Sequence, residues 1–285
     1  MSPELHLPRA AILAANFVVT VAALAAAAVA PARAADASAW DGDQRAAVRL
    51  IAGTPRRDGA AATQRAGIEI RLAPGWKTYW RYPGDAGVPP RFDFSGSRNL
   101  KQASVRYPAP HVLSDESGTS IGYKNEVTFP LEIVAEDAGK PVTLALKIDY
   151  AVCEKICIPA EGKAELALDG MAQAEYLALA HGEARVPVPG TVGDGAALSI
   201  RAVTREGKRV LVDVAAPGSV ELFAEGPTPE WALPVPVAVA GAPAGQQRFA
   251  FALDGLPSGA SATGAELRLT AVAGALAIEV PYRLD

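Results

Sequence analysis

The sequence has few of the side chains with which most enzymes do their chemistry. Of its 285 residues, two are cysteine, three are histidine and two are methionine. Only His111 and His181 lie beyond the N-terminal segment, and no motif places either beside a nucleophile, which argues against a Cys–His hydrolase. The H-E-x-x-H and P-loop patterns are absent as well. We therefore expect neither a metalloprotease nor a nucleotide enzyme, and no cofactor.

The chain also lacks an excess of one charge. It carries 27 Lys and Arg residues against 31 Asp and Glu residues. Leaving out Arg9, Arg33 and Glu4 of the first 34 residues, 25 basic and 30 acidic side chains remain, a net charge near −5. This balance predicts neither nucleic acid nor an anionic membrane surface as a partner.

Long apolar runs are confined to the N-terminus. A run from Ala10 to Ala30 follows Arg9 and leads into Ala32-Arg33-Ala34, the three-part pattern of a secretory signal. The alternative is an uncleaved anchor, because the run approaches the ~20 residues that span a bilayer. Its alanine-rich composition favours cleavage after Ala34, export to the periplasm and no membrane insertion afterwards. That compartment is oxidising, so disulfides can persist there.

Strand patterns dominate the rest of the chain, as in an antiparallel sandwich. Clusters of Pro and Gly at Tyr82–Pro90, Tyr107–Pro110 and Ala138–Pro141 predict turns and loops. The strands expected in the first half are Val48–Ile51, Gly67–Leu72, Val127–Ile133 and Val142–Ile148. Those expected in the second half are Ala197–Val203, Arg209–Ala215, Ser219–Ala224, Arg248–Leu253, Ala265–Ala271 and Leu276–Tyr282.

One stretch, Gly170–Arg185, has a helical composition, and the stiff Val186–Gly190 that follows reads as a linker. We place the domain boundary there. The expected organisation is a signal peptide at 1–34, a sandwich that contains both cysteines at 41–169, a helix and linker at 170–195, and a second small β-sandwich at 196–285, with Trp231 in its core.

Cys153 and Cys157 follow the last expected strand of the first domain. A disulfide that closes so short a loop stabilises a fold by only ~2 kcal/mol, so its contribution to the stability of the domain is small. A tight turn would leave the sulfurs at the surface, where exposed bridges are the labile, exchanging ones. Lys155 could stabilise a thiolate and Glu154 would oppose it. The spacing alone leaves an inert surface bridge and an exchanging bridge equally open.

Four blocks of residues between Ala46 and Leu168 form a specific combination when taken in order. They are Pro74 to Arg81, Pro83 to Pro90, Gly122-Tyr123-Lys124 with Phe129-Pro130-Leu131, and Asp149 to Pro159. Through these blocks the segment resembles the N-terminal periplasmic domain of the disulfide reductase DsbD and of the related ScsB proteins. The resemblance implies an all-β fold with immunoglobulin-like antiparallel sandwiches and a reversible disulfide.

The resemblance also implies partners and roles. It implies electron transfer from a thioredoxin-like or CcdA/DsbD-like membrane thiol reductase, through the sandwich, to oxidised periplasmic client proteins such as those of cytochrome c biogenesis. Cys157 would be the exchanging nucleophile and Cys153 the resolving thiol. The sequence given contains no membrane relay and no C-terminal C-x-x-C domain, so we expect the reductant to be a separate protein.

The family covers its disulfide with a loop that carries an aromatic cap, and the matching segment here, 114–122, has none. Ile121 or Tyr123 could substitute. Asp115 and Glu116 could tune the cysteines, although acidic pairs in polar segments are usually only solvated. Trp76, Tyr79 and Trp80 fall where the family lines its cysteine cleft with aromatics. We favour a core position for Trp76 and leave Tyr79 open.

Three functions follow. The first is a thiol–disulfide carrier, a component of a protein-disulfide reductase. The second is a copper-binding or copper-tolerance module, since two thiolates can bind Cu(I). A single methionine beyond Met1, namely Met171, and the scarcity of histidine argue against it. The third is a non-catalytic envelope binding module with a structural disulfide. Whether the chain is an enzyme stays open at this point.

Overall fold

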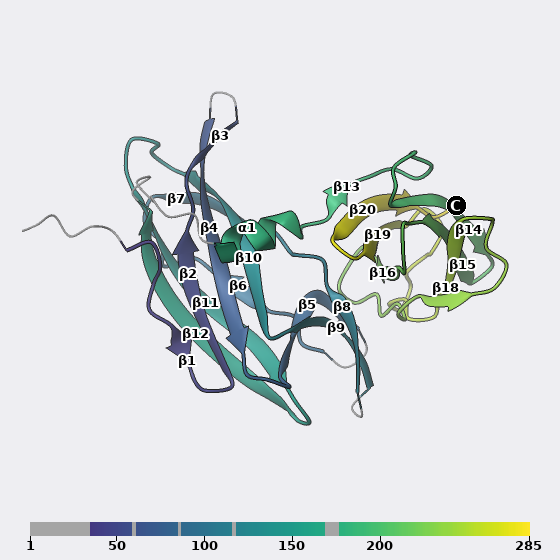
Figure 1. The fold of residues 1–285 in the computed structure, drawn as a ribbon, viewed down its shortest axis with the longest axis horizontal. Helices are drawn as coiled ribbons and strands as arrows, with labels where there is room; N and C mark the ends of the chain where they lie inside the picture. Colours follow the sequence, from purple (N-terminus) through teal and green to yellow (C-terminus); the bar gives the residue numbers. More distant parts are fainter. Residues whose placement is uncertain (1–34, 59–60, 85–86, 116–117, 169–176) are drawn as a thin grey trace, which may run out of the picture. The chain divides into compact units, whose positions relative to one another are not determined.

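The chain folds into four largely antiparallel sheets that pair into two β-sandwiches (Figure 1). The computed structural model describes residues 35–58, 61–84, 87–115, 118–168 and 177–285. The expected signal peptide and Glu116 lie outside the described residues. No described helix is long and apolar enough to cross a membrane.

The first sandwich consists of two six-stranded sheets, which face each other across an apolar core. One sheet contains β1 (Asp41–Gly42), β2 (Ala46–Ala52), β3 (Arg56–Asp58), β4 (Ala61–Leu72), β10 (Glu126–Ala135) and β7 (Leu100–Val105). The other contains β12 (Cys157–Leu168), β11 (Val142–Cys153), β5 (Lys77–Gly84), β9 (Gly118–Lys124), β8 (His111–Asp115) and β6 (Arg91–Asp93). Alternate residues of these strands point into the core, among them Ile68 and Ile70 of β4 and Leu144, Leu146 and Ile148 of β11.

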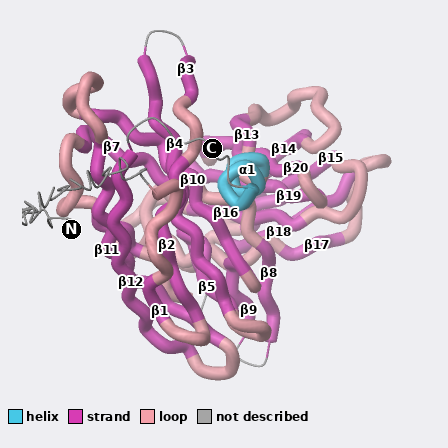
Figure 2. Tube along the Cα trace, turned by 60° about the vertical axis from the view of Figure 1, so that its left-hand side comes forward, coloured by secondary structure: helices cyan, strands magenta, loops and turns pink. Residues whose placement is uncertain are grey.

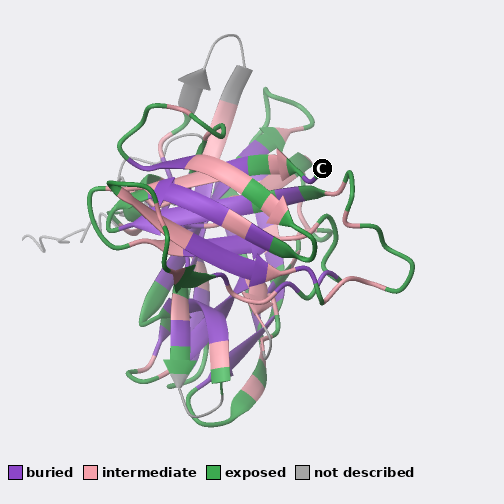
Figure 3. Ribbon diagram, turned by 90° about the vertical axis from the view of Figure 1, so that its right-hand side faces the viewer, coloured by how far each residue is buried: buried purple, intermediate pink, exposed green. Residues whose placement is uncertain are grey.

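The second sandwich has two four-stranded sheets. One contains β13 (Val188–Pro189), β20 (Leu276–Arg283), β19 (Glu266–Ala273) and β16 (Glu221–Glu225). The other contains β14 (Ser199–Glu206), β15 (Arg209–Ala215), β18 (Gln246–Ala252) and β17 (Val237–Val239). Buried residues line these strands and exposed residues gather in their loops (Figure 3). Trp231 lies in this core, as predicted.

The strands predicted from alternation are confirmed: each expected range overlaps one of β2, β4, β10, β11, β14, β15, β16, β18, β19 and β20. The turn expected at Tyr82–Pro90 is wrong at its start, because β5 continues to Gly84. The described part of the expected helix is α1 (Leu177–Ala184), which packs on β10 and β4 (Figure 2). Residues 170–176 lie outside the described residues.

Part of the segment expected to be a linker pairs with the second sandwich. β13 pairs in parallel with β20, and the Gly190 N–H donates to the Glu279 carbonyl at 2.9 Å. Ala34–Asp285 form one compact unit, in which Phe223, Val272 and Ala277 join the apolar cluster of the first sandwich. The division into domains at 41–169 and 196–285 remains our proposal.

Candidate functional site at the cysteine pair

Cys153 and Cys157 face each other at the end of a long hairpin and form a disulfide. β11 and β12 pair without a register shift from Val142 opposite Leu168 to Cys153 opposite Cys157. Three residues, Glu154 to Ile156, make the turn, and the two cysteine Cα atoms lie 4.2 Å apart. The regular register of the hairpin therefore brings the two sulfurs together at its tip.

The two cysteines differ in their exposure to solvent because of their positions in the sheet. β11 is flanked by β12 and β5, so Cys153 has Cys157 on one side and Lys77 on the other, and it is 1% exposed. β12 is an edge strand, so Cys157 has a neighbouring strand on one side only and is exposed. Next to it, Ile156 is 75% exposed. Cys157 is therefore the more exposed residue of the pair.

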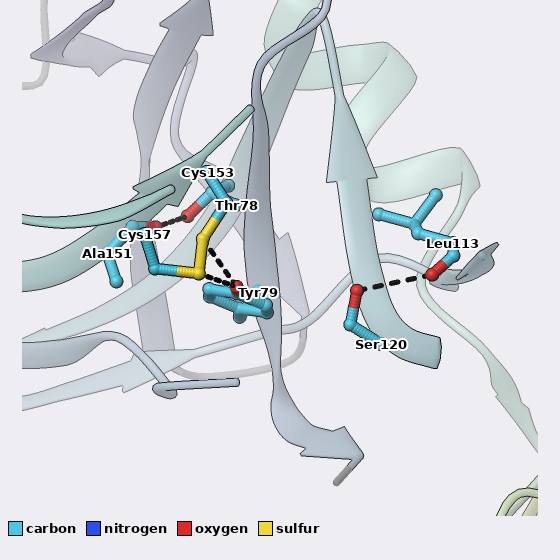
Figure 4. The surroundings of a disulfide bond; sticks show 7 residues. All are labelled: Thr78, Tyr79, Leu113, Ser120, Ala151, Cys153 and Cys157. Carbon is cyan, nitrogen blue, oxygen red and sulfur yellow. Dashed lines mark hydrogen bonds between the residues drawn. A yellow bond between two sulfur atoms is a disulfide. The ribbon is translucent and has the colours of Figure 1, made fainter. Parts of the chain in front are cut away.

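Tyr79 covers the disulfide from β5. Its hydroxyl lies 2.7 Å from the Cys153 sulfur and 3.0 Å from the Cys157 sulfur (Figure 4). The phenol is 1% exposed and forms a small cluster with Ala151 and Cys153, separate from the main core. A phenolic O–H is a hydrogen-bond donor, and such a bond strengthens when the acceptor carries a negative charge. Tyr79 is thus placed to stabilise a thiolate at either sulfur.

Close packing and hydrogen bonding hold Tyr79 in this position. The Thr78 hydroxyl donates to the Ala151 carbonyl at 2.9 Å, which ties β5 to β11 (Figure 4). Gly122 faces Tyr79 across the β5–β9 ladder, where a Cβ atom would lie 2.0 Å from the Thr78 carbonyl oxygen. A Cβ atom at Gly87 would lie 2.6 Å from the Tyr79 ring, so the chain after β5 lies against that ring. Only residues without a side chain fit at both positions.

The structure does not bring the predicted cap residues to the sulfurs. Ile121 and Tyr123 belong to the apolar core, on the face of the sheet opposite the disulfide. Tyr123 pairs with Thr78 and donates its hydroxyl to the Pro108 carbonyl at 2.8 Å, and burial raises its pKa well above the usual value. The expected cap segment is mostly the β8–β9 hairpin, in which Asp115 pairs with Gly118. Trp76 packs partly buried against the core.

Two residues near the site carry signals that sequence reasoning did not use. Lys77 pairs with Cys153 in the β5–β11 ladder and is 3% exposed. In the sequence, only its position two residues before Tyr79 indicated that it lies near the site. Ser120 lies in a G-x-S-x-G spacing, from Gly118 to Gly122, that is typical of a hydrolase nucleophile. However, Ser120 is buried within β9 and its hydroxyl donates to the Leu113 carbonyl (Figure 4). It is not at a strand-to-helix turn, so it lacks the geometry of that nucleophile.

Across the described part of the chain, no three His, Cys, Asp or Glu residues lie close enough together to hold a metal ion.

Part of the chain matches a known protein family, and the chain is similar to a solved structure. Residues 47–169 match the family described as "Thiol:disulfide interchange protein DsbD, N-terminal". Among solved structures, the chain is similar to the N-terminal periplasmic domain of ScsB from Proteus mirabilis, with 20% sequence identity and a TM-score of 0.64. The match covers 87% of this chain and 98% of that one. No curated protein matches the sequence. The immunoglobulin-like all-β fold is thereby confirmed.

Proposed function

Residues 47–169 belong to the family of DsbD N-terminal domains, and from this premise we propose that the chain exchanges its Cys153–Cys157 disulfide with protein thiols. The observation that carries the proposal is the difference in exposure between the two cysteine residues: Cys157 is exposed and Cys153 is 1% exposed. When a thiolate attacks the accessible sulfur of a disulfide, the other sulfur is the leaving group.

The chemistry takes place in two steps. A thiolate of a reduced partner attacks the Cys157 sulfur, the Cys153–Cys157 bond breaks, and Cys153 leaves as a thiolate that the Tyr79 hydroxyl stabilises. The partner's second thiol then attacks the mixed disulfide and releases Cys157. The partner becomes a disulfide, and the chain gains two electrons and two protons. Reversal of the same steps reduces an oxidised client, with Cys157 as the attacking thiolate.

We further propose a place for this exchange. The similar ScsB domain is a periplasmic domain, and the pattern from Ala10 to Ala34 is that of an export signal. In that compartment the donor would be a thioredoxin-like or membrane-bound thiol reductase, and the acceptors would be oxidised envelope proteins. The chain would thus be the intermediate carrier of a protein-disulfide reductase system.

The first test is a trapping experiment with two matched single-cysteine variants. The probe is a thioredoxin-like protein whose one remaining active-site cysteine is activated as a mixed disulfide with a coloured aromatic thiol. We expect Cys153→Ser to displace the coloured thiol and form a stable protein–protein disulfide, because Cys157 is accessible. Cys157→Ser should not, because its remaining thiol is buried. Comparable trapping by both variants would contradict the assigned order.

An equilibrium titration of the wild-type chain in glutathione buffers completes the test. Exchanging bridges have potentials well above about −300 mV, whereas structural bridges lie below it. A bridge that resists reduction throughout the glutathione range, together with no trapped probe, would instead identify a binding module with a structural disulfide.

A further inference from the structure

The strand that carries Tyr79 is irregular immediately after that residue. In the β5–β9 ladder, Tyr79 faces Gly122, but the next regular pair is Gly84 with Ser120. Four residues of β5, 80–83, therefore lie opposite a single residue of β9, Ile121. Such a bulge leaves ladder positions unpaired, so its shape depends on other contacts.

Those other contacts come from the second sandwich. The Trp80 ring packs on Phe223, with centroids 5.6 Å apart. The Arg81 guanidinium binds both carboxylate oxygens of Glu225, at 2.8 and 2.7 Å, and it also contacts Glu279. Three strands of this chain, β5, β16 and β20, thus meet at one cation. A bidentate pair of this kind fixes the orientation of both side chains.

Tyr82 is the third anchor of the bulge. Its hydroxyl lies 2.7 Å from the Trp231 carbonyl oxygen and 2.9 Å from that of Leu233. Its ring packs against the cores of both sandwiches. Residues 80, 81 and 82 are therefore all held by the second sandwich, beginning one residue after the tyrosine that covers the disulfide.

We propose that the second sandwich is a positioning part of the redox site: by holding the bulge of β5 it fixes the Tyr79 hydroxyl on the two sulfurs, and so sets the reduction potential of the pair. The inference rests on the proposed function. Tyr79 stabilises a thiol or thiolate more than a disulfide sulfur, which is a weak acceptor. A displaced Tyr79 therefore makes the disulfide harder to reduce. Tyr82 and Arg81 are positioning residues that act through Tyr79.

The test is a double-mutant cycle on the full chain. The quantity measured for each variant is the equilibrium constant for reduction of the Cys153–Cys157 disulfide by glutathione. Tyr79→Phe should shift this constant toward the disulfide by about threefold to tenfold, the value of one hydrogen bond. Tyr82→Phe should shift it in the same direction by a smaller factor. If the anchor acts through Tyr79, then Tyr82→Phe should have no further effect in the Tyr79→Phe background, since coupled residues are not additive.

The matched control is Tyr282→Phe. The Tyr282 hydroxyl lies 3.3 Å from the Val203 carbonyl oxygen, a contact between two strands of the second sandwich, β20 and β14. This variant should leave the equilibrium constant unchanged. Glu225→Gln, which weakens the Arg81 anchor without removing volume, provides a second variant should Tyr82→Phe fold poorly. An additive cycle, or no shift with either anchor variant, would overturn the inference.

The failure of the inference can be told from the failure of the proposed function. If the wild-type chain exchanges with glutathione but the cycle is additive, only the positioning role is wrong. If the wild-type disulfide is not reduced at any glutathione ratio, the exchange function itself fails and the inference with it.

Discussion

Gly122 sets the distance between β5 and β9 at the residue that covers the disulfide. It faces Tyr79 in the ladder, and any Cβ atom there would overlap the Thr78 carbonyl at 2.0 Å. The overlap is with backbone, so no rotamer change can relieve it. Gly122→Ala should therefore push β5 away from β9 and destabilise the fold by about 3 kcal/mol, the upper end of the range for overpacking.

The measurement for Gly122→Ala is the midpoint of denaturant unfolding, with Gly195→Ala as the control. Gly195 is exposed and a Cβ atom there would meet no atom within 4 Å. The control should have the same unfolding midpoint as the wild type. If Gly122→Ala is also as stable as the wild type, then β5 and β9 are not held at the distance described.

Which side chains reach the sulfurs could be predicted only in part. The cysteines and Tyr79 stand in sequence blocks with a fixed order, which identified the cysteines but left the place of Tyr79 open. Ile121 and Tyr123 were also candidates, yet both face the core. Successive residues of a strand point to opposite faces, so the register of β9 against β5 decides which residue faces the disulfide. No local pattern in the sequence marks that register, which pairs Tyr79 with Gly122.

At the scale of elements, β12 and β5 show what alternation does not reveal. β12 carries Pro159 and Gly162 and exposes much of its length, so it does not resemble a buried strand. Proline is tolerated there because β12 lies at the edge of its sheet. β5 continues through Pro83 because the bulge removes the need for a ladder hydrogen bond at that residue. In both strands, position in the sheet outweighs composition.

α1 is a short helix whose stability depends on packing. Leu179 is fully buried and Glu183 binds Arg65 at 2.7 Å, whereas Leu177 is 87% exposed. Leu179→Ala should therefore cost about 2–5 kcal/mol through the cavity that it leaves. Leu177→Ala removes the same atoms from an exposed site and should cost little. Unfolding midpoints of the two variants provide the comparison, and equal midpoints would mean that α1 is not docked on its sheet.

At the scale of the whole molecule, the sequence predicted two sandwiches but not how they are joined. The contacts link residues more than a hundred positions apart, such as Arg81 with Glu225 and His111 with Glu221. In the sequence each of these is a single charged or polar residue in a strand, indistinguishable from a solvated one. Long-range pairing of this kind needs the folded chain.

His111, Glu221 and Arg185 form the second charged contact between the sandwiches. An Arg185 N–H lies 3.0 Å from His111 Nε2 and must donate to it, so His111 Nδ1–H donates to Glu221 at 2.9 Å. The Val112 N–H donates to the other carboxylate oxygen at 2.8 Å. Burial alone would raise the pKa of Glu221, but these hydrogen bonds outweigh it and lower that pKa below its usual value of 4.5.

A lowered folded-state pKa gives this contact a defined pH dependence. The ionised Glu221 stabilises the folded chain fully above pH 4.5, and this stabilisation is lost as the pH falls through the lower folded-state pKa. We therefore expect Glu221→Gln to lower the thermal midpoint at neutral pH and to converge with the wild type in acid. The exposed Glu136, changed to Gln, serves as the control and should show no such convergence. Thermal midpoints measured from pH 7 to pH 3 test this prediction. If the difference in midpoint between Glu221→Gln and the wild type stays constant with pH, then Glu221 does not hold the sandwiches together through its charge.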